Sequence, residues 1–165
     1  MKNKFVLFVI SLGFLAVVIV AVNIINPLRL WERRNDSIRI NDLKSIASAL
    51  ASYYKNYGQY PPANPKEYII VFNKGFGTDN VYWGTPWEPY MKLVPRDPTP
   101  KRRYVYWSEV TDNYQSFRLY ASLEDPGSVP QACSMGQDCP FVPGKNLCGN
   151  NIPCNYGITS LNVSP

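Results

Sequence analysis

Histidine is absent from the sequence. Because histidine is the commonest catalytic acid–base and a frequent metal ligand, enzyme mechanisms would have to rest on Ser–Lys, cysteine or carboxylate chemistry. A phosphate-binding glycine loop is also missing, since Gly75-Phe76-Gly77 is too short and no helical pattern follows it. These absences predict a protein that is not an enzyme and that needs no cofactor.

Charge is missing from the apolar run Phe5–Ile25. A bilayer core about 30 Å thick requires roughly 20 apolar residues in a helix, and this run is long enough. It exceeds the roughly 15 residues of a signal-peptide core and lacks a polar-flanked Ala-x-Ala site, which favours retention over cleavage during export. We therefore predict a transmembrane helix over residues 1–27, followed by one small domain over residues 28–165.

Cysteine is confined to the last part of the chain, where four residues occur: Cys133, Cys139, Cys148 and Cys154. An even number in a Gly/Pro-rich segment behind a membrane helix favours disulfides formed in an oxidising compartment. Three pairings are open, of which Cys133–Cys139 and Cys148–Cys154 need the least chain reorganisation. A zinc site of four thiolates is the alternative, although neither spacing has the tight CxxC form. With Lys2 and Lys4 at the N-terminus, this predicts a single-pass membrane protein whose C-terminal domain lies outside the cytoplasm.

An amphipathic stripe marks the next segment, residues 28–57. Its apolar members follow helical spacing: Leu43, Ile46, Ala47, Leu50, Tyr53, Tyr54 and Tyr57. Gly58 is a natural C-terminal cap, and Pro61-Pro62 prevents the helix from resuming. Together with residues 5–25 this is either one long helix or two helices joined near Asn26-Pro27. The stripe is expected to cover a sheet.

Strand signals come later in the chain. Residues 58–100 are a mixed connection, in which Tyr68–Phe72 is helix or strand and Gly75–Pro89 is an irregular loop. Residues 101–123 predict an antiparallel hairpin, with strands at Arg103–Trp107 and Tyr114–Leu123. Residues 124–165 predict a disulfide-held loop. The fold class is α+β, a long N-terminal helix with a membrane half and an amphipathic half packed on a small antiparallel sheet.

Candidate ligand-binding residues are few. Four aspartates occupy predicted turns, and turn chemistry explains them: Asp97, Asp112, Asp125 and Asp138. They are also weak candidates for calcium, without EF-hand spacing. The formal charge is +5 and the basic residues are scattered apart from Arg33-Arg34 and Lys101–Arg103, so nucleic acid is not favoured as a partner. Four aromatic residues read as exposed could stack on sugars or bases, but packing is the favoured role: Trp83, Trp87, Tyr90 and Trp107.

Several motifs occur in an order that is informative. In the helix and its exit these are Asn26-Pro27-Leu28, Arg33–Asp36, Asn41–Ile46, Leu50–Tyr54 and Gly58-Gln59-Tyr60-Pro61. Beyond them stand Val94-Pro95-Arg96-Asp97-Pro98, Tyr114–Ala121 and Cys154-Asn155-Tyr156-Gly157-Ile158. This order resembles type IV pilins and the pseudopilins of type II secretion systems, the major-pseudopilin-like group in particular. Val94–Pro98 is similar to that group's Pro-x-Asp-Pro turn, and Tyr114–Ala121 to its central strand.

The resemblance implies a structural subunit of a type IV pilus or type II secretion pseudopilus, built through the hydrophobic helix. Its partners would be copies of itself, the membrane and the assembly machinery, and the filament would be periplasmic or extracellular. The assembly helix would begin at Phe5 and bend at Pro27. Gly13, Ala16 and Ala21 are small enough to permit close helix approach.

The N-terminus departs from the family pattern. Lys4 rather than glycine precedes Phe5, and the first carboxylate is Glu32. This departure favours an alternative, an uncleaved single-pass anchored surface domain that binds DNA or glycan through Lys101, Arg102, Arg103 and the tryptophans.

Overall fold

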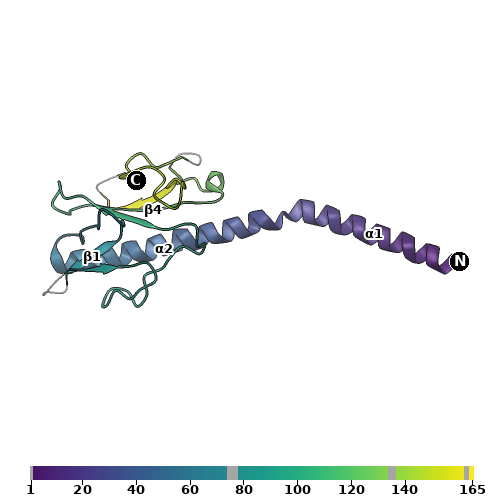
Figure 1. Cartoon of the computed structure of the whole chain (residues 1–165), viewed down its shortest axis with the longest axis horizontal. Helices are drawn as coiled ribbons and strands as arrows, with labels where there is room; N and C mark the ends of the chain where they lie inside the picture. The colour runs from purple at the N-terminus through teal and green to yellow at the C-terminus, as the bar shows by residue number, and fades with distance from the viewer. Residues whose placement is uncertain (1, 74–77, 134–136, 162–163) are drawn as a thin grey trace.

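Two helices form a long shaft at the N-terminal end of the chain. The computed structural model describes residues 2–73, 78–133, 137–161 and 164–165, and within them all side chains except those of residues 2, 3, 5, 9, 20–25, 72, 73 and 78. Helix α1 spans Lys2–Ile25 and α2 spans Pro27–Tyr57. Figure 1 shows α1 and the start of α2 projecting from a head that contains the C-terminus.

The junction between the helices is a single residue. Asn26 adopts a left-handed conformation (φ 40°, ψ 75°), and its side chain accepts a hydrogen bond from the Arg29 amide. Pro27 takes the first position of α2, where its missing N–H costs nothing, and it disfavours a helical conformation for the residue before it. Of the two alternatives, the two-helix arrangement is therefore correct. The far end of α2 is capped by Gly58 at φ 71°, as its sequence position predicts.

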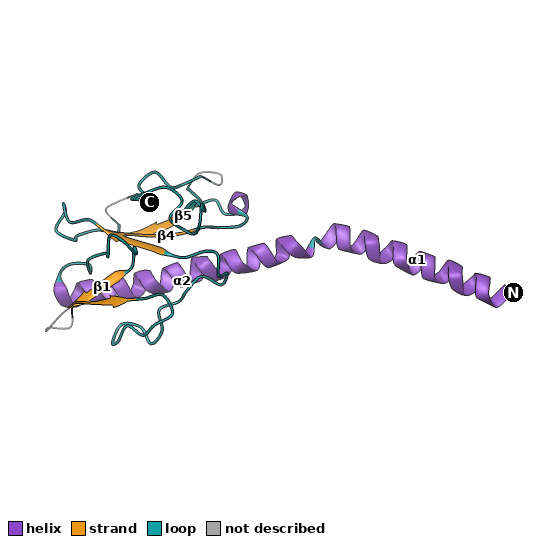
Figure 2. Cartoon of the chain, viewed as in Figure 1, coloured by secondary structure: helices purple, strands orange, loops and turns teal. Residues whose placement is uncertain are grey.

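The strands form two small antiparallel sheets (Figure 2). In one, β1 (Ile70–Asn73) pairs with β2 (Thr78–Val81). In the other, β4 (Phe117–Ala121) lies between β3 (Val105–Ser108) and β5 (Tyr156–Thr159). The α+β class and the 101–123 hairpin are thus confirmed, and the undecided Tyr68–Phe72 segment contributes strand β1.

Two predicted loops contain strands. β2 lies inside the stretch Gly75–Pro89, and β5 lies in the tail that was predicted to be loop throughout. β5 satisfies the second edge of β4, which would otherwise expose unpaired backbone groups. The sequence gives only a weak strand signal at β5, because Gly157 lies within it and glycine is a poor strand former. It is required there, since a Cβ on Gly157 would come within 3.0 Å of the Tyr120 ring.

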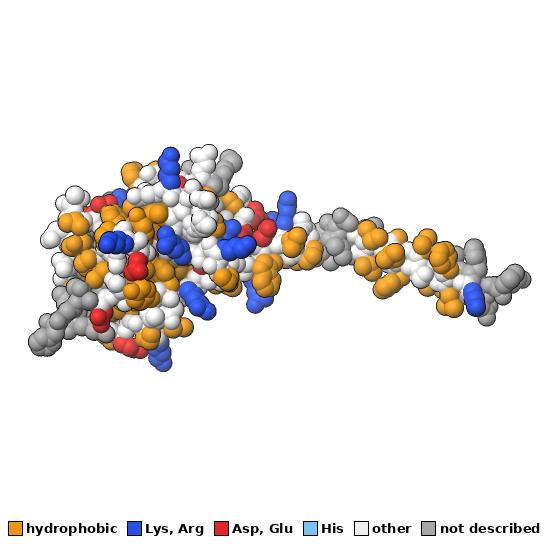
Figure 3. Space-filling model, in the orientation of Figure 1, with side chains coloured by type: hydrophobic (Ala, Val, Ile, Leu, Met, Phe, Trp, Pro, Cys, Tyr) orange, Lys and Arg blue, Asp and Glu red, His pale blue; other side chains and the backbone are white. Residues whose placement is uncertain are grey.

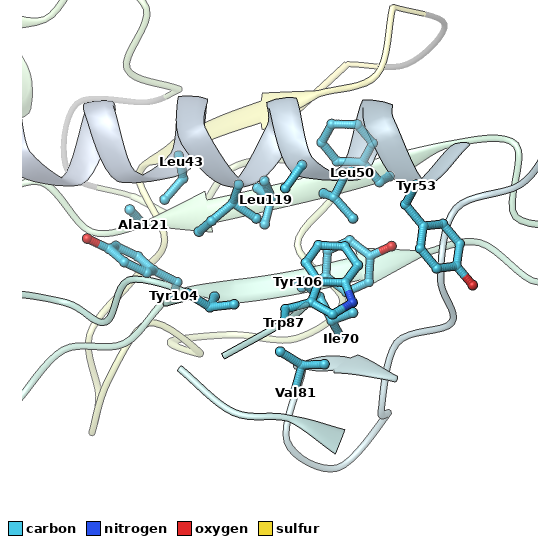
Figure 4. Packing of buried hydrophobic residues seen from close by; sticks show 14 of the residues in the cluster. Leu43, Leu50, Tyr53, Ile70, Val81, Trp87, Tyr104, Tyr106, Leu119 and Ala121 are labelled. Carbon is cyan, nitrogen blue, oxygen red and sulfur yellow. The ribbon is translucent and has the colours of Figure 1, made fainter. Parts of the chain in front are cut away.

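The core lies between α2 and the sheets (Figure 4). The stripe residues Leu43, Ile46, Leu50 and Tyr53 are buried there, as their spacing predicts, whereas Tyr57 is exposed. The expectation that Trp87 is exposed is wrong: the residue is 2% exposed and joins this core. Its ring centroid lies 5.9 Å from that of Tyr53. The short loop that carries Trp87 folds under α2 because burial of so large a ring contributes strongly to stability.

Three tyrosines of the three-stranded sheet region are fully buried, Tyr104, Tyr106 and Tyr120. Tyr106 donates to the Pro61 carbonyl at 2.6 Å, and Tyr104 donates to Asp42 at 2.7 Å. The hydroxyl of Tyr120 has no hydrogen-bond partner among the described residues. Burial raises the pKa of all three phenols. The three rings are therefore equally buried, but only the hydroxyls of Tyr104 and Tyr106 have a hydrogen-bond partner among the described residues.

This difference predicts opposite outcomes for one chemical change. Tyr120→Phe removes a buried hydroxyl that has no partner, so we expect the free energy of unfolding to rise by about 1 kcal/mol. Tyr106→Phe removes a donor from the Pro61 carbonyl, so we expect a loss of about 1 kcal/mol. Urea unfolding of both variants, followed by far-ultraviolet circular dichroism, measures the two changes. A loss of stability in Tyr120→Phe as large as that in Tyr106→Phe would contradict the assignment.

Candidate assembly surface

Helix α1 presents apolar side chains that no other described part of the chain covers. Every described α1 side chain from Lys4 to Ile19 is exposed, including Phe14 at 72% and Val17 at 66%. A Cβ placed on Gly13 would meet nothing within 4 Å. Figure 3 shows apolar side chains on the described part of this helix, far from the head. Monomeric soluble proteins rarely expose a continuous apolar surface of this kind, so it marks an interaction surface.

The apolar surface continues onto the first turns of α2. Leu28, Leu30 and Trp31 are all more than half exposed. We call α1 and the α2 residues up to Trp31 the rod, and the described residues from Asn35 onward the head. Asn35 is the first buried residue of α2, so the boundary lies within a single helical turn.

The predicted assembly residues all map to the rod. Gly13 and Ala16 lie exposed on α1, and Pro27 lies exposed at the start of α2. Phe5 and Ala21 are within α1, but their side chains are outside the described ones. No helix in the described parts of the chain meets the combined length and hydropathy criteria for a membrane span. The predicted transmembrane segment therefore stays a prediction.

On the head side of this boundary, one buried arginine forms ion pairs with three carboxylates. The Arg39 side chain is 0% exposed, and it donates from Nη1 to Asp36 Oδ1 at 2.7 Å. Its Nε and Nη2 form a bidentate pair with Asp97, at 2.9 and 3.1 Å. Nη2 also reaches Glu124 Oε1 at 3.3 Å. A planar guanidinium suits this role because its donors form a fixed fork that matches carboxylates.

Backbone N–H groups donate further hydrogen bonds to two carboxylates of this network. Asp36 accepts the backbone N–H groups of Glu124 and Asp125, each at 2.8 Å. Asp97 accepts the backbone N–H of Thr99, also at 2.8 Å. The network therefore fastens the turn at Asp97 and the loop after β4 to one position on α2.

The charge state of Arg39 is secured by its neighbours. Burial alone would lower the pKa of Arg39, but the hydrogen bonds and charge of Asp97, with those of Asp36 and Glu124, outweigh that effect and raise it. Arg102 supplies a second cation, with its Nε 3.5 Å from Glu124 Oε1. Two arginines thus face three carboxylates, and removal of Arg39 would leave buried negative charge uncompensated.

The four aspartates considered for calcium have separate local partners. Asp97 binds Arg39, and Asp125 pairs with the exposed Arg33 at 3.1 Å. Asp112 accepts the Gln115 N–H at 3.0 Å, while Asp138 accepts the N–H groups of Asn146 and Cys154. Among the described residues no group of three or more His, Cys, Asp or Glu side chains is placed to hold a metal ion. Each of the four thus has a turn or ion-pair role, and whether any of them also binds calcium is untested.

The cysteines form the two short disulfides, Cys133–Cys139 and Cys148–Cys154. Their Cα–Cα separations are both 5.1 Å, within the usual range. Asp138 accepts the Cys154 N–H at 2.8 Å, and the Cys139 N–H donates to the Cys154 carbonyl at 2.7 Å, so the two loops lie against each other. The disulfide expectation is confirmed, and the thiolate zinc alternative is excluded because the thiols are consumed.

Sequence reasoning missed the role of Arg39. In the sequence Arg39 counts only as one of the scattered basic residues. The available signal was its position, because Arg39 lies four residues before Leu43 and therefore on the buried face of α2. A charged residue on that face requires a buried partner of opposite charge. Asp97, in the turn between Pro95 and Pro98, was a candidate for that partner.

Known proteins offer no guide to this surface. No protein family, curated protein or solved structure matches the chain.

The network predicts a large contrast between two arginines of α2. Arg39→Met leaves Asp36, Asp97 and Glu124 without their shared cation, so we expect a loss of about 3–5 kcal/mol in unfolding free energy. Arg33→Met breaks a pair whose arginine is 56% exposed, so we expect a change within about 1 kcal/mol. Denaturant unfolding of the full chain measures both. Equal losses in the two variants would show that the buried network does not carry this stability.

Proposed function

We propose that this chain is a structural, non-catalytic subunit of a pilin-like or pseudopilus-like filament, assembled through its N-terminal rod. The observation that carries the proposal is the contrast within one helical shaft. One face of α2 is buried within the head from Asn35 onward, whereas every described α1 side chain is exposed. A long apolar surface with no covering element requires a second partner.

Copies of the same rod are the partner that fits best. The uncharged part of α1, residues 5–25, can pack against identical helices by shape, and Gly13 and Ala16 allow close approach. The head lies at one end of the shaft and the rod at the other (Figure 1). Contacts that join different parts of two copies generate an open helical filament when the rotation between copies does not close a ring, and this is the arrangement proposed for the rods.

A membrane is the natural reservoir for the unassembled subunit. In the proposal, α1 lies in lipid while the head stays outside the cytoplasm, where its two disulfides are stable. Assembly exchanges lipid for neighbouring rods, and both surroundings satisfy the same apolar surface. The sequence motifs that resemble pilins support this reading, since they fall in the elements that form the shaft, the turn at Asp97 and β4.

The proposal predicts that charge on the rod blocks assembly and that charge on the head does not. Val17→Asp places a carboxylate on α1 at a position that is 66% exposed in the single chain. Val110→Asp is the matched control, because Val110 lies in a head loop and is 68% exposed. We expect fibres in the sheared surface fraction of producing cells for the wild type and Val110→Asp, and at least a tenfold loss for Val17→Asp, since a lone charge in an apolar contact is costly.

Two further measurements complete this test. Electron microscopy with antibody labelling identifies the chain in the fibres, and thermal unfolding confirms that the Val17→Asp head is intact. Wild-type protein that stays wholly in the membrane fraction, with no labelled fibre, would contradict the filament proposal and favour the permanently anchored alternative.

A further inference from the structure

A basic groove lies on the head directly outside the Arg39 network. It consists of two adjoining hollows of about 720 and 370 Å³ that share Pro100, Arg102 and Arg103 in their linings. Lys101 and Gly149 line the larger hollow, and Arg96 and Trp83 line the smaller one. Four cationic side chains therefore face one continuous concave surface.

The frame of the groove is fixed by backbone contacts and a disulfide. The Arg103 N–H donates to the Cys148 carbonyl at 2.9 Å, and Arg102 bridges to Gly149. A side chain on Gly149 would collide with the Lys101 carbonyl and with Ile152. The loop closed by Cys148–Cys154 is therefore docked tightly against residues 101–103. A preorganised frame of this kind lowers the entropic cost of binding.

The four cations of the groove are of two kinds: two are held by hydrogen bonds or ion pairs within the head, and two have no ion pair among the described residues. Arg102 is held by Ser122 and Glu124, and Arg103 Nε donates to the Leu147 carbonyl at 2.6 Å. Arg96 and Lys101 are exposed and form no ion pair with any other described residue. Two carboxylates belong to this region and are already paired: Asp97, which lines the smaller hollow, is buried against Arg39, and Glu124 is shared by Arg39 and Arg102. An incoming anion thus meets positive groups first.

We propose that this groove binds a single strand of an acidic polysaccharide through its carboxylate groups. Guanidinium groups match carboxylates with paired hydrogen bonds, and lysine adds a mobile charge. Two joined hollows suit successive anionic units of one chain. The inference is independent of filament assembly, because the groove lies wholly in the head.

The shape and lining of the groove favour a polysaccharide over nucleic acid. Single-stranded nucleic acid is usually held by several aromatic platforms on which successive bases stack. Among the described lining residues only Trp83 is aromatic, and its ring packs against Tyr104 with centroids 5.8 Å apart. Duplex DNA is read by elements that enter its roughly 12 Å major groove, whereas these cations line hollows in the protein itself.

Binding of labelled polygalacturonate, whose sugars each carry a carboxylate, tests the inference. The full chain is kept in solution with a neutral detergent, and fluorescence anisotropy is measured at an ionic strength of about 0.15 M, where charges more than about 8 Å apart are largely screened. The expected result is binding to polygalacturonate and none to neutral dextran. The double variant Arg96→Gln/Lys101→Gln should weaken binding about tenfold, because it removes two charge-assisted contacts. Neither residue takes part in the buried network, so the head should keep its wild-type unfolding midpoint.

Matched charge removal elsewhere supplies the control. Lys55→Gln/Lys66→Gln changes the net charge equally at two exposed positions outside the groove, and its affinity should stay within about twofold, since exposed charges at a distance are screened. Equal weakening by both double variants would overturn the site in favour of diffuse attraction. Tighter binding of single-stranded or duplex oligonucleotides than of polygalacturonate would overturn the ligand class, and no binding of polygalacturonate would overturn the proposal outright.

Discussion

The Arg39 ion-pair network is the constraint on which the arrangement of this molecule depends. One guanidinium joins carboxylates from α2, from the turn at Asp97 and from the loop after β4. Those segments lie far apart in the sequence, and the network brings them to one position on the shaft. Buried ion pairs are often replaceable by apolar packing without loss of stability, so their value here is positional. An apolar side chain in place of Arg39 would allow the sheets to shift along the apolar stripe of α2. Paired charges instead fix the position of the sheets relative to the helix.

This fixed register divides the shaft into two parts with different roles. From Asn35 to Tyr53, α2 buries its inner face against β4 and the loop that carries Trp87. From Trp31 back to Lys4, the described side chains are exposed. Asn26 and Pro27 break the shaft within the exposed part, so α1 and α2 need not be collinear. The two disulfides pack with Val105 and Tyr120 of the three-stranded sheet, and the loop closed by Cys148–Cys154 lines part of the basic groove.

Much of this fold could be predicted from the sequence, because its signals are local. The stripe from Leu43, the glycine cap and the 101–123 hairpin each depend on neighbours within a few residues. Other features depend on contacts between distant segments and had no local signal. β5 exists because β4 has a free edge, Gly157 is required by the Tyr120 ring, and Trp87 is buried because its loop reaches α2. Arg39 is an intermediate case. Its position on the buried face of α2 follows from helical spacing, but the identity of its carboxylate partners depends on distant segments.

The most direct test of this account asks what lies against α1 in the assembled material. Phe14 can be replaced with the photoreactive analogue benzoylphenylalanine, which preserves the aromatic ring at an exposed rod position. Irradiation followed by mass spectrometry of the adducts identifies the nearest neighbour. The account predicts cross-links from position 14 to the α1 segment of a second copy. Adducts between position 14 and the head of the same chain would contradict it, because the rod would then be covered from within.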